Sequence, residues 1–178
     1  RRKFMGKFPR NLAALNAVAD GIGWTKPAAP GVFRGVAQMM AFGSYVAAAC
    51  ELSVTDGTKV KIHRIVAATD CGYAVNPAQI QRQVSGSFVY GLSALFEEEC
   101  TVKDGRIEQK NFDTFGSIRL AQMPKVETII IEGGGKEWGG IGEPTICVAA
   151  PAVLNAIYRA TGKRMRTVPL KNSGMTLV

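Results

Sequence analysis

Apolar residues recur along this chain with two different periods, one typical of helices and one typical of strands. Between residues 12 and 22 they return every three or four positions, which predicts a helix that ends at Gly23. A second helix is predicted after Asn76-Pro77, because asparagine suits the N-cap and proline the first helical position. Its apolar residues fall on one face: Ile80, Val84, Phe88, Gly91 and Leu95. A third run of helical spacing covers residues 145–161.

Strand-like segments lie between these helices. Residues 42–55 and 59–69 flank Asp56-Gly57, a dipeptide typical of tight hairpin turns, and are predicted to form antiparallel strands. A second hairpin is expected to turn at Asp104-Gly105, and residues 126–132 read as a short β-branched strand. The pattern predicts an α/β fold of the α+β kind, with mixed sheets, hairpins and two or three long helices.

A glycine-rich segment precedes the third helix. Residues 133–142 contain six glycines, which is too many for a packed element and indicates a loop shaped by a ligand or a partner. The segment ends in Gly139-Gly140-Ile141-Gly142-Glu143-Pro144. Two interpretations of Glu143 are open from these residues alone. It is either a general base facing a ligand, or an acid in the first turn of a helix, where the helix dipole favours negative charge.

Composition narrows the classes of function. The chain has 178 residues, 47% of them hydrophobic, which is enough for one domain with a core or for two small lobes. Its formal charge of +8 fits either an anionic partner or a basic solvated surface. Basic residues gather in positions 1–10 and 159–171, with the acidic run Glu97-Glu98-Glu99 between them. No basic stretch is interleaved with aromatic residues as single-strand binding requires, so we favour the solvated surface.

The residues that most often bind metals give no recognisable site. The cysteines stand far apart, at positions 50, 71, 100 and 147, and we interpret them as buried free thiols. His63 lies in an alternating run and fits the surface of a strand. The sequence therefore predicts no metal ion held by protein side chains. No apolar run is long enough to span a membrane.

Five short motifs are more specific in combination than any one of them alone. In chain order they are Asp70-Cys71-Gly72, Asn76-Pro77, Gln83-Val84-Ser85-Gly86, Phe88-Val89-Tyr90-Gly91-Leu92 and Gly140-Ile141-Gly142-Glu143-Pro144. In this order they resemble the molybdenum-binding subunit of the xanthine dehydrogenase and aldehyde oxidase family. The branch that looks most similar is the one typified by the large, or beta, subunit of isoquinoline 1-oxidoreductase. Further segments similar to that branch are Arg34-Gly35, Phe42-Gly43-Ser44-Tyr45, Asn111-Phe112 and the tail 151–170.

The resemblance covers nearly the whole chain and implies a fold and a chemistry. The fold would be the molybdenum-cofactor-binding domain of the aldehyde oxidase and xanthine dehydrogenase type. The activity would be oxidation of an N-heterocycle or aldehyde carbon, with water as the oxygen source. Glu143 is at the position of the family's catalytic glutamate, so the resemblance assigns it the role of general base. Burial against an apolar wall would raise the pKa of its carboxyl group, which suits a base that works near neutrality.

The resemblance also implies contacts with a cofactor. Gln83 is at the position of a glutamine near the pterin, although a helix-surface glutamine is an equally good interpretation. Gly140 and Gly142 are expected to present N–H groups to the cofactor, and Gly86 and Gly91 to allow close packing. The cofactor would be molybdenum-molybdopterin in its cytosine dinucleotide form, with the metal held by the pterin and not by the protein. The sequence departs from the branch pattern at 136–138 and at 145–147, and the resemblance does not define the local loop shape there.

The same resemblance suggests how the chain is organised. Residues 1–178 would be the C-terminal part of a molybdopterin-binding domain within a longer chain, with residues 1–35 as a linking helix and loop. The implied partners are the rest of the large subunit, a small subunit carrying iron–sulfur clusters and a small-molecule substrate. We expect the 178 residues alone to hold no molybdenum and to be inactive. A non-catalytic assembly or remnant module and a basic nucleic-acid-binding domain are the alternatives, and both the bacterial cytoplasm and the periplasm remain open as compartments.

Overall fold

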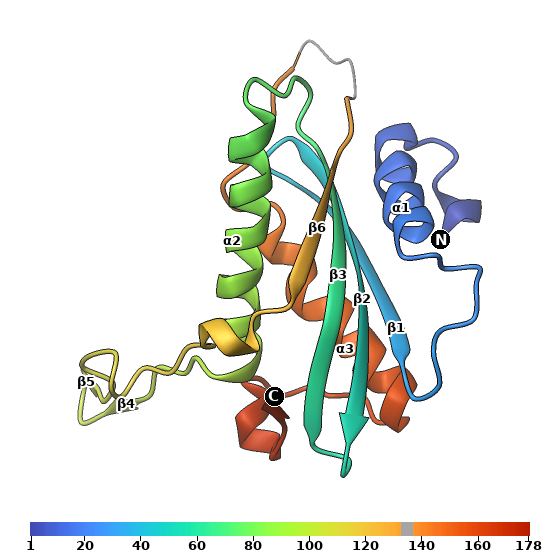
Figure 1. Ribbon diagram of the computed structural model, residues 1–178. Helices are drawn as coiled ribbons and strands as arrows, with labels where there is room; N and C mark the ends of the chain where they lie inside the picture. Colours follow the sequence, from blue (N-terminus) through green and yellow to red (C-terminus); the bar gives the residue numbers. More distant parts are fainter. Residues whose placement is uncertain (133–136) are drawn as a thin grey trace.

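The computed structural model describes residues 1–132 and 137–178, and in it a mixed sheet separates helices on its two faces (Figure 1). Three short 3-10 turns lie at Arg2–Phe4, Leu120–Gln122 and Leu170–Ser173. The helices and strands are α1 (Pro9–Gly21), β1 (Phe33–Ala41), β2 (Ser44–Thr55), β3 (Lys59–Asp70), α2 (Pro77–Phe96), β4 (Val102–Lys103), β5 (Arg106–Ile107), β6 (Lys125–Ile130), α3 (Ile146–Thr161) and β7 (Thr176–Leu177). The expected α/β class with hairpins and long helices is confirmed.

The main sheet has the strand order β1-β2-β3-β6, with β7 also paired to β3. The β1–β2 and β2–β3 pairs are antiparallel, whereas β6 and β7 run parallel to β3. The predicted hairpin between residues 42–55 and 59–69 is confirmed, and Asp56 and Gly57 both have the positive φ angles that such a turn requires. The second predicted hairpin is also present as β4 and β5, which carry two residues each.

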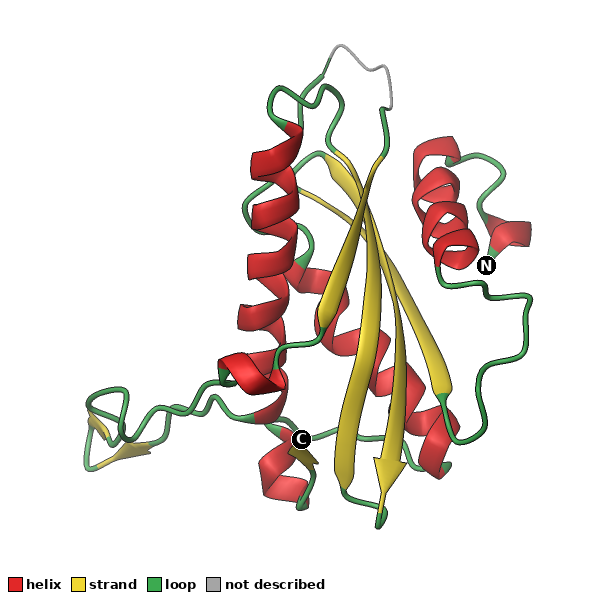
Figure 2. Cartoon of the chain, in the orientation of Figure 1, coloured by secondary structure: helices red, strands yellow, loops and turns green. Residues whose placement is uncertain are grey.

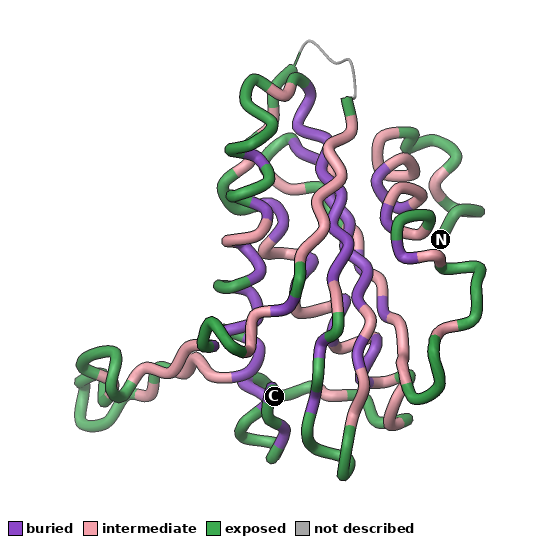
Figure 3. Tube along the Cα trace, in the orientation of Figure 1, coloured by how far each residue is buried: buried purple, intermediate pink, exposed green. Residues whose placement is uncertain are grey.

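Helices cover both faces of this sheet (Figure 2). Successive residues of a strand point to opposite faces, and in β2 they enter two different cores. Ala47 and Ala49 pack with α1, while Ala48 and Cys50 pack with α2 and α3. Both cores draw on the central strands, where the buried residues of Figure 3 are concentrated. The stretches 46–50 of β2 and 65–70 of β3 are buried on both faces, because a helix covers each side of the sheet there.

Residues 1–35, which we expected to be a linking helix and loop, include a helix that packs on the sheet. The side chains of Ala14, Val18 and Ile22 are buried against the strands. The helix begins at Pro9, three residues before the start that the apolar spacing predicted. Among the described residues no helix is both long and apolar enough to cross a bilayer.

The predicted helix after Asn76-Pro77 is confirmed as α2. The Asn76 side chain accepts a hydrogen bond of 3.2 Å from the N–H of Gln79, and Pro77 occupies the first turn. The third predicted helix is confirmed as α3 and ends at Gly162 in the left-handed conformation. It begins at Ile146, one residue after the start of the predicted run, and Pro144 lies in the turn before the helix.

Strand β1 was missed in the sequence, and the prediction that a strand starts at Phe42 was wrong. Phe42 and Gly43 form the turn between β1 and β2, with φ angles of 52° and 75°. A positive φ is uncommon for a bulky residue, so Phe-Gly carried no hairpin signal. The later strand, predicted at 126–132, is β6 and spans Lys125–Ile130.

The cysteines match their prediction only in part. Cys50 and Cys71 are buried free thiols, but Cys100 is exposed and Cys147 is half-buried. Burial raises the pKa of the Cys50 thiol to about 12, so this group stays protonated and inert. His63 is exposed on β3 as expected, where its ring lies 3.0 Å from the Ser53 hydroxyl.

Two glycines allow helix α3 to approach its neighbours closely. A Cβ atom added at Gly91 would lie 2.6 Å from the Cβ of Ala149, which confirms the packing role expected for this residue on α2. Gly86 was expected to do the same, but a Cβ there would meet nothing within 4 Å. At Gly35 on β1, a Cβ would lie 2.1 Å from the carbonyl oxygen of Ala152.

We therefore expect Gly35→Ala to lower the free energy of unfolding by about 3 kcal/mol, the upper end of the usual overpacking cost. The added methyl group meets backbone atoms of α3, which cannot turn aside as a flexible side chain can. Urea denaturation measures the effect, with Gly86→Ala on the open face of α2 as the matched control. Equal stability of the two variants would contradict the tight β1–α3 contact.

Candidate active site

Three loops meet at one end of the sheet: the β1–β2 turn, the segment that follows β3, and residues 137–145. The first two hold the third, which is the described part of the glycine-rich segment and leads to α3. The N–H of Gly140 donates to the carbonyl of Phe42 at 2.8 Å, and the N–H of Gly139 donates to the carbonyl of Cys71 at 3.0 Å. The buried hydroxyl of Ser44 donates to the carbonyl of Gly140 at 2.5 Å. The loop that leads to Glu143 is thus fixed to the sheet at two successive residues.

Glycine is required in this loop for contacts within the chain itself. A Cβ atom at Gly139 would lie 2.2 Å from the Ser44 hydroxyl oxygen. At Gly72, which has a φ of 85°, it would lie 2.3 Å from the carbonyl oxygen of Glu137. The high glycine content of this loop, which suggested a ligand, is therefore explained in part by close packing against neighbouring turns. Gly133 to Lys136, the start of the predicted loop, lie outside the described residues.

Gly140 and Gly142 differ in what they can offer a ligand. The N–H of Gly140 is already bonded to Phe42, so the expectation that it points at a cofactor is not the arrangement seen here. A Cβ atom at Gly142 would meet nothing within 4 Å, and this residue is exposed. Gly142 therefore leaves its backbone accessible to an approaching group, next to Glu143.

Glu143 is exposed and its side chain forms no hydrogen bond or ion pair within the described part of the chain. The alternative role, an acid in the first turn of a helix, is not seen: α3 has no acidic residue in its first turn and no side-chain cap. Glu143 contacts the start of the helix only through its backbone carbonyl, which accepts a hydrogen bond of 3.0 Å from the N–H of Ile146. The expected burial of the carboxylate is likewise absent in this chain.

Gln83 lies on the exposed surface of α2. One turn further along the helix, the buried hydroxyl of Ser87 is hydrogen-bonded to that of Thr145. Residues four apart on a helix share a face, and Thr145 comes two residues after Glu143. The loop and α2 are therefore joined on the side of α2 that carries Gln83, although no hydrogen bond links Gln83 to Glu143 in the described residues.

A partly buried ion pair supports the segment after β3, and only the motif Asp70-Cys71-Gly72 pointed to this segment in the sequence. Arg10 of α1 forms two hydrogen bonds of 2.7 Å with Asp70, whose side chain is 1% exposed. The N–H of Gly72 donates to the same carboxylate at 3.0 Å. Burial alone would raise the pKa of Asp70, but the bonds from Arg10 and Gly72 outweigh it and hold the pKa below its usual value.

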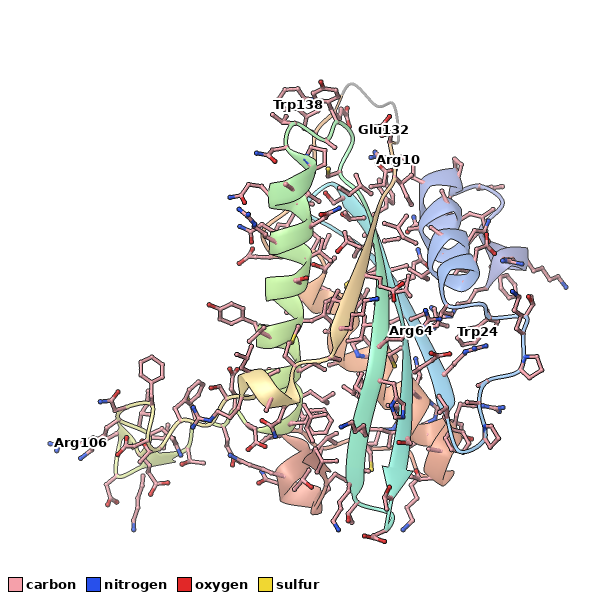
Figure 4. All side chains as sticks on the ribbon, viewed as in Figure 1. Arg10, Trp24, Arg64, Arg106, Glu132 and Trp138 are labelled. Atoms are coloured by element: carbon pink, nitrogen blue, oxygen red, sulfur yellow. The ribbon has the colours of Figure 1, made fainter. Side chains whose placement is uncertain are left out.

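Arg10 also lies 4.3 Å from the ring centre of Tyr45, at the same end of the sheet as Trp138 (Figure 4). We expected the basic residues of positions 1–10 to form a solvated surface, and Arg10 departs from this. Trp138 stacks on Tyr73, with ring centres 6.1 Å apart, and both rings are exposed. An aromatic pair therefore stands beside the loop that carries Glu143.

Comparison with known proteins defines the class of protein. A family profile described as the molybdopterin cofactor-binding domain matches residues 16–124. The chain therefore belongs to the molybdopterin cofactor-binding domain family, and its resemblance to the xanthine dehydrogenase and aldehyde oxidase family is confirmed. The described residues contain no cluster of three or more His, Cys, Asp or Glu side chains that could bind a metal ion.

Individual relatives are named as subunits of oxidoreductases. It is 26% identical to the beta subunit of isoquinoline 1-oxidoreductase from Brevundimonas diminuta, over 92% of this chain and 21% of that protein. It is 31% identical to the molybdenum-binding subunit of an aldehyde oxidoreductase from Escherichia coli, over 67% of this chain and 18% of that protein. The chain thus spans about a fifth of the length of these relatives.

Solved structures agree on the fold. Quinoline 2-oxidoreductase from Pseudomonas putida 86 superimposes with a TM-score of 0.62 at 20% identity, over 71% of this chain and 17% of that one. At this identity the match supports the fold, and the chemistry has to be argued from the site.

Proposed function

We propose that this chain is the C-terminal portion of the molybdenum-binding subunit of a molybdenum hydroxylase, which oxidises an N-heterocycle or aldehyde carbon with oxygen from water. The observation that carries the proposal is Glu143. Its carboxylate is exposed, has no structural partner among the described residues, and ends a loop that is bonded to the sheet at Gly139 and Gly140. A carboxylate without a structural role, carried on a loop whose backbone is anchored to the sheet, is suited to act on a ligand.

The residues around Glu143 fit a large polar cofactor at this edge. Gly142 leaves room for close approach, and Gln83 carries an exposed amide that can pair with a pterin edge. The proposed cofactor is molybdenum-molybdopterin in its cytosine dinucleotide form, which when bound supplies the Lewis acid and the acceptor for the electron pair. Gly140 would contribute by position and not by its N–H, which is bonded to Phe42.

Glu143 would act as general base. The carboxylate accepts the proton from the hydroxyl group that attacks the substrate carbon, and later releases it to solvent. Because Glu143 is exposed in this chain, its water-excluded surroundings would come from the bound cofactor, the substrate and the rest of the large subunit.

Other partners follow from the same proposal. Several relatives are named as subunits of larger enzymes, so this chain would work with the rest of the large subunit. A small subunit carrying iron–sulfur clusters would take up the electrons. Alone, the 178 residues would hold no molybdenum, since the pterin would carry the metal and the chain spans only about a fifth of the length of its relatives.

Isotope labelling tests the reaction. The assembled enzyme, given an N-heterocycle or an aldehyde in H₂¹⁸O, is expected to place one ¹⁸O atom in each product molecule, as mass spectrometry can show. For aldehydes, a short reaction time and a no-enzyme control correct for exchange of the carbonyl oxygen with water. Label that comes from ¹⁸O₂ instead, or no oxidation of either substrate class by an assembled enzyme that contains molybdenum, would refute the proposal.

A further inference from the structure

Strand β1 forms one edge of the sheet. It is nine residues long, and within residues 1–132 and 137–178 it pairs with β2 alone. The carbonyl of Val36 accepts a hydrogen bond from the Asn155 side chain of α3, so this carbonyl points away from β2. In an antiparallel pair the direction alternates along the strand, and the backbone groups of Arg34 and Gln38 therefore point outward as well. The Val36 carbonyl is occupied by Asn155, so a further strand would pair with the outward backbone groups of Arg34 and Gln38.

A groove follows this edge. Three cavities, of about 480, 400 and 420 Å³, share Arg1 in their lining and are therefore neighbours. Residues of β1 form the floor, with Val36 in two of them and Gln38 in the third. One wall comes from the first turns of the chain and Trp24, which Figure 4 labels beside the sheet, and the opposite wall from α3 and the residues after it.

The walls of the groove are mainly basic and aromatic, with Asp20 as the acidic residue of the lining. The Arg164 guanidinium lies 3.7 Å from the ring centre of Tyr158 and donates to the Asn155 side chain. Arg159 and Arg164 are exposed, and neither they nor Arg1 form an ion pair with any described residue. Members of two basic groups that are far apart in the sequence are thus brought to one groove: Arg1, Arg2 and Lys3 from the first group, and Arg159 and Arg164 from the second. The exposed rings of Phe4 and Phe8 lie in the same groove.

We propose that this groove binds an extended acidic segment of another protein, which pairs with β1 as an added edge strand. Backbone hydrogen bonds to β1 supply affinity that does not depend on side chains, and alternate side chains supply specificity. Carboxylates on one side of the segment meet Arg159 and Arg164, whose planar guanidinium groups match carboxylate geometry. Apolar side chains on the other side meet the aromatic rings of Phe4, Phe8 and Trp24. This site is separate from the loop that carries Glu143, and the proposal does not depend on the enzymatic function.

Peptide binding to the 178-residue chain tests the proposal. The probe is a capped, fluorescently labelled nonapeptide in which valine alternates with glutamate and threonine, compared with its lysine counterpart and with a labelled single-stranded DNA decamer. Saturable binding of the acidic peptide is expected by fluorescence anisotropy, with affinity at least about tenfold above that of the lysine peptide. Amide hydrogen exchange is expected to slow at Arg34, Val36 and Gln38 when the acidic peptide is bound.

Charge reversal distinguishes specific binding in the groove from nonspecific attraction by the net charge of the chain. Arg159→Glu with Arg164→Glu is expected to weaken binding of the acidic peptide at least about tenfold. Lys103→Glu with Arg106→Glu changes the net charge equally on the β4–β5 hairpin, far from the groove (Figure 4), and should leave the affinity within about twofold. Should the first pair fail to fold, Arg159→Gln with Arg164→Gln serves in its place.

Several results would overturn the proposal. They are equal weakening by the two charge reversals, no slowing of exchange along β1, and equal binding of both peptides. Tighter binding of the DNA decamer than of the acidic peptide would assign the groove to phosphate groups. Slow exchange along β1 in the free chain, together with a dimer in analytical ultracentrifugation, would assign it to a second copy of this chain.

Discussion

Replacing Glu143 with Gln is expected to lower turnover of the assembled enzyme at least about 100-fold, the usual loss when general-base catalysis is removed. Gln keeps the shape and hydrogen-bonding reach of Glu but accepts no proton from the attacking hydroxyl group. Because Glu143 is exposed and lacks a side-chain partner in the described residues, the melting temperature and the molybdenum content should stay near those of the unaltered enzyme. Steady-state kinetics, calorimetry and elemental analysis on the same preparation measure the three quantities.

Glu137→Gln is the matched control for this prediction. Glu137 lies in the same loop and is exposed, but its contact with Gly72 uses the backbone carbonyl, so the variant should retain near-normal turnover. A Glu143→Gln enzyme that is destabilised by about 1 kcal/mol yet fully active would indicate a helix-capping role. Equal loss of turnover in both variants would show that the loop, and not the Glu143 carboxylate, is what matters.

Replacing Arg10 with Met is expected to destabilise the fold by about 3 kcal/mol, the lower end of the usual cost of removing one partner of a buried ion pair, because the Arg10 side chain is itself 28% exposed. Asp70 would remain as a charge with 1% exposure and would keep only the N–H of Gly72 as a partner. Adding Asp70→Asn removes that charge, so the double variant should recover part of the loss. Urea denaturation at neutral pH gives the free energies of unfolding.

Lys59→Met is the control for the ion pair. It removes the bridge between Lys59 and Asp56, whose side chains are 56% and 65% exposed, and exposed pairs contribute less than about 1 kcal/mol. A cost for Arg10→Met as small as that for Lys59→Met would mean that the Arg10–Asp70 pair does not hold α1 to the sheet.

The same pair predicts a dependence of stability on pH. The pKa of Asp70 is lower in the folded chain than in the unfolded one, so its contribution is fully present above the unfolded value of about 4. It is lost as the pH falls through the folded value. Between about pH 5 and about pH 2, the unaltered chain should therefore lose more stability than the double variant Arg10→Met with Asp70→Asn. Parallel curves for the two proteins would contradict this assignment.

Much of the fold could be predicted because its signals are local. Asn76 and Pro77 start α2, Asp56-Gly57 closes a hairpin and Gly162 ends α3, and each acts through backbone preferences that neighbouring residues do not override. Strand β1 was missed for the opposite reason. It is closed by Phe42 at a φ of 52°, a conformation that the local sequence disfavours and that contacts with Gly140 and the sheet support.

The candidate site was predictable only in part. Glu143 was found because its motif resembles that of a known family, whereas only the structure shows that its side chain does not cap α3. The Arg10–Asp70 pair spans 60 positions, and no periodicity or spacing in a single sequence connects such residues. Likewise, the use of Gly140 N–H by Phe42 depends on where the β1–β2 turn lies. Long-range pairing, which single-sequence patterns do not encode, accounts for these differences.

The way the Glu143 loop is attached also bears on the order of folding. Its hydrogen bonds join residues near positions 42, 71 and 140, so the loop can settle only after β1, β2 and β3 have come together. Contacts between distant parts of a chain form late because the intervening segments must first lose their freedom. On mild heating the same region is expected to open before the cores beneath the sheet, since local openings cost less than global unfolding. Catalytic competence would then be the last property gained in folding and the first lost.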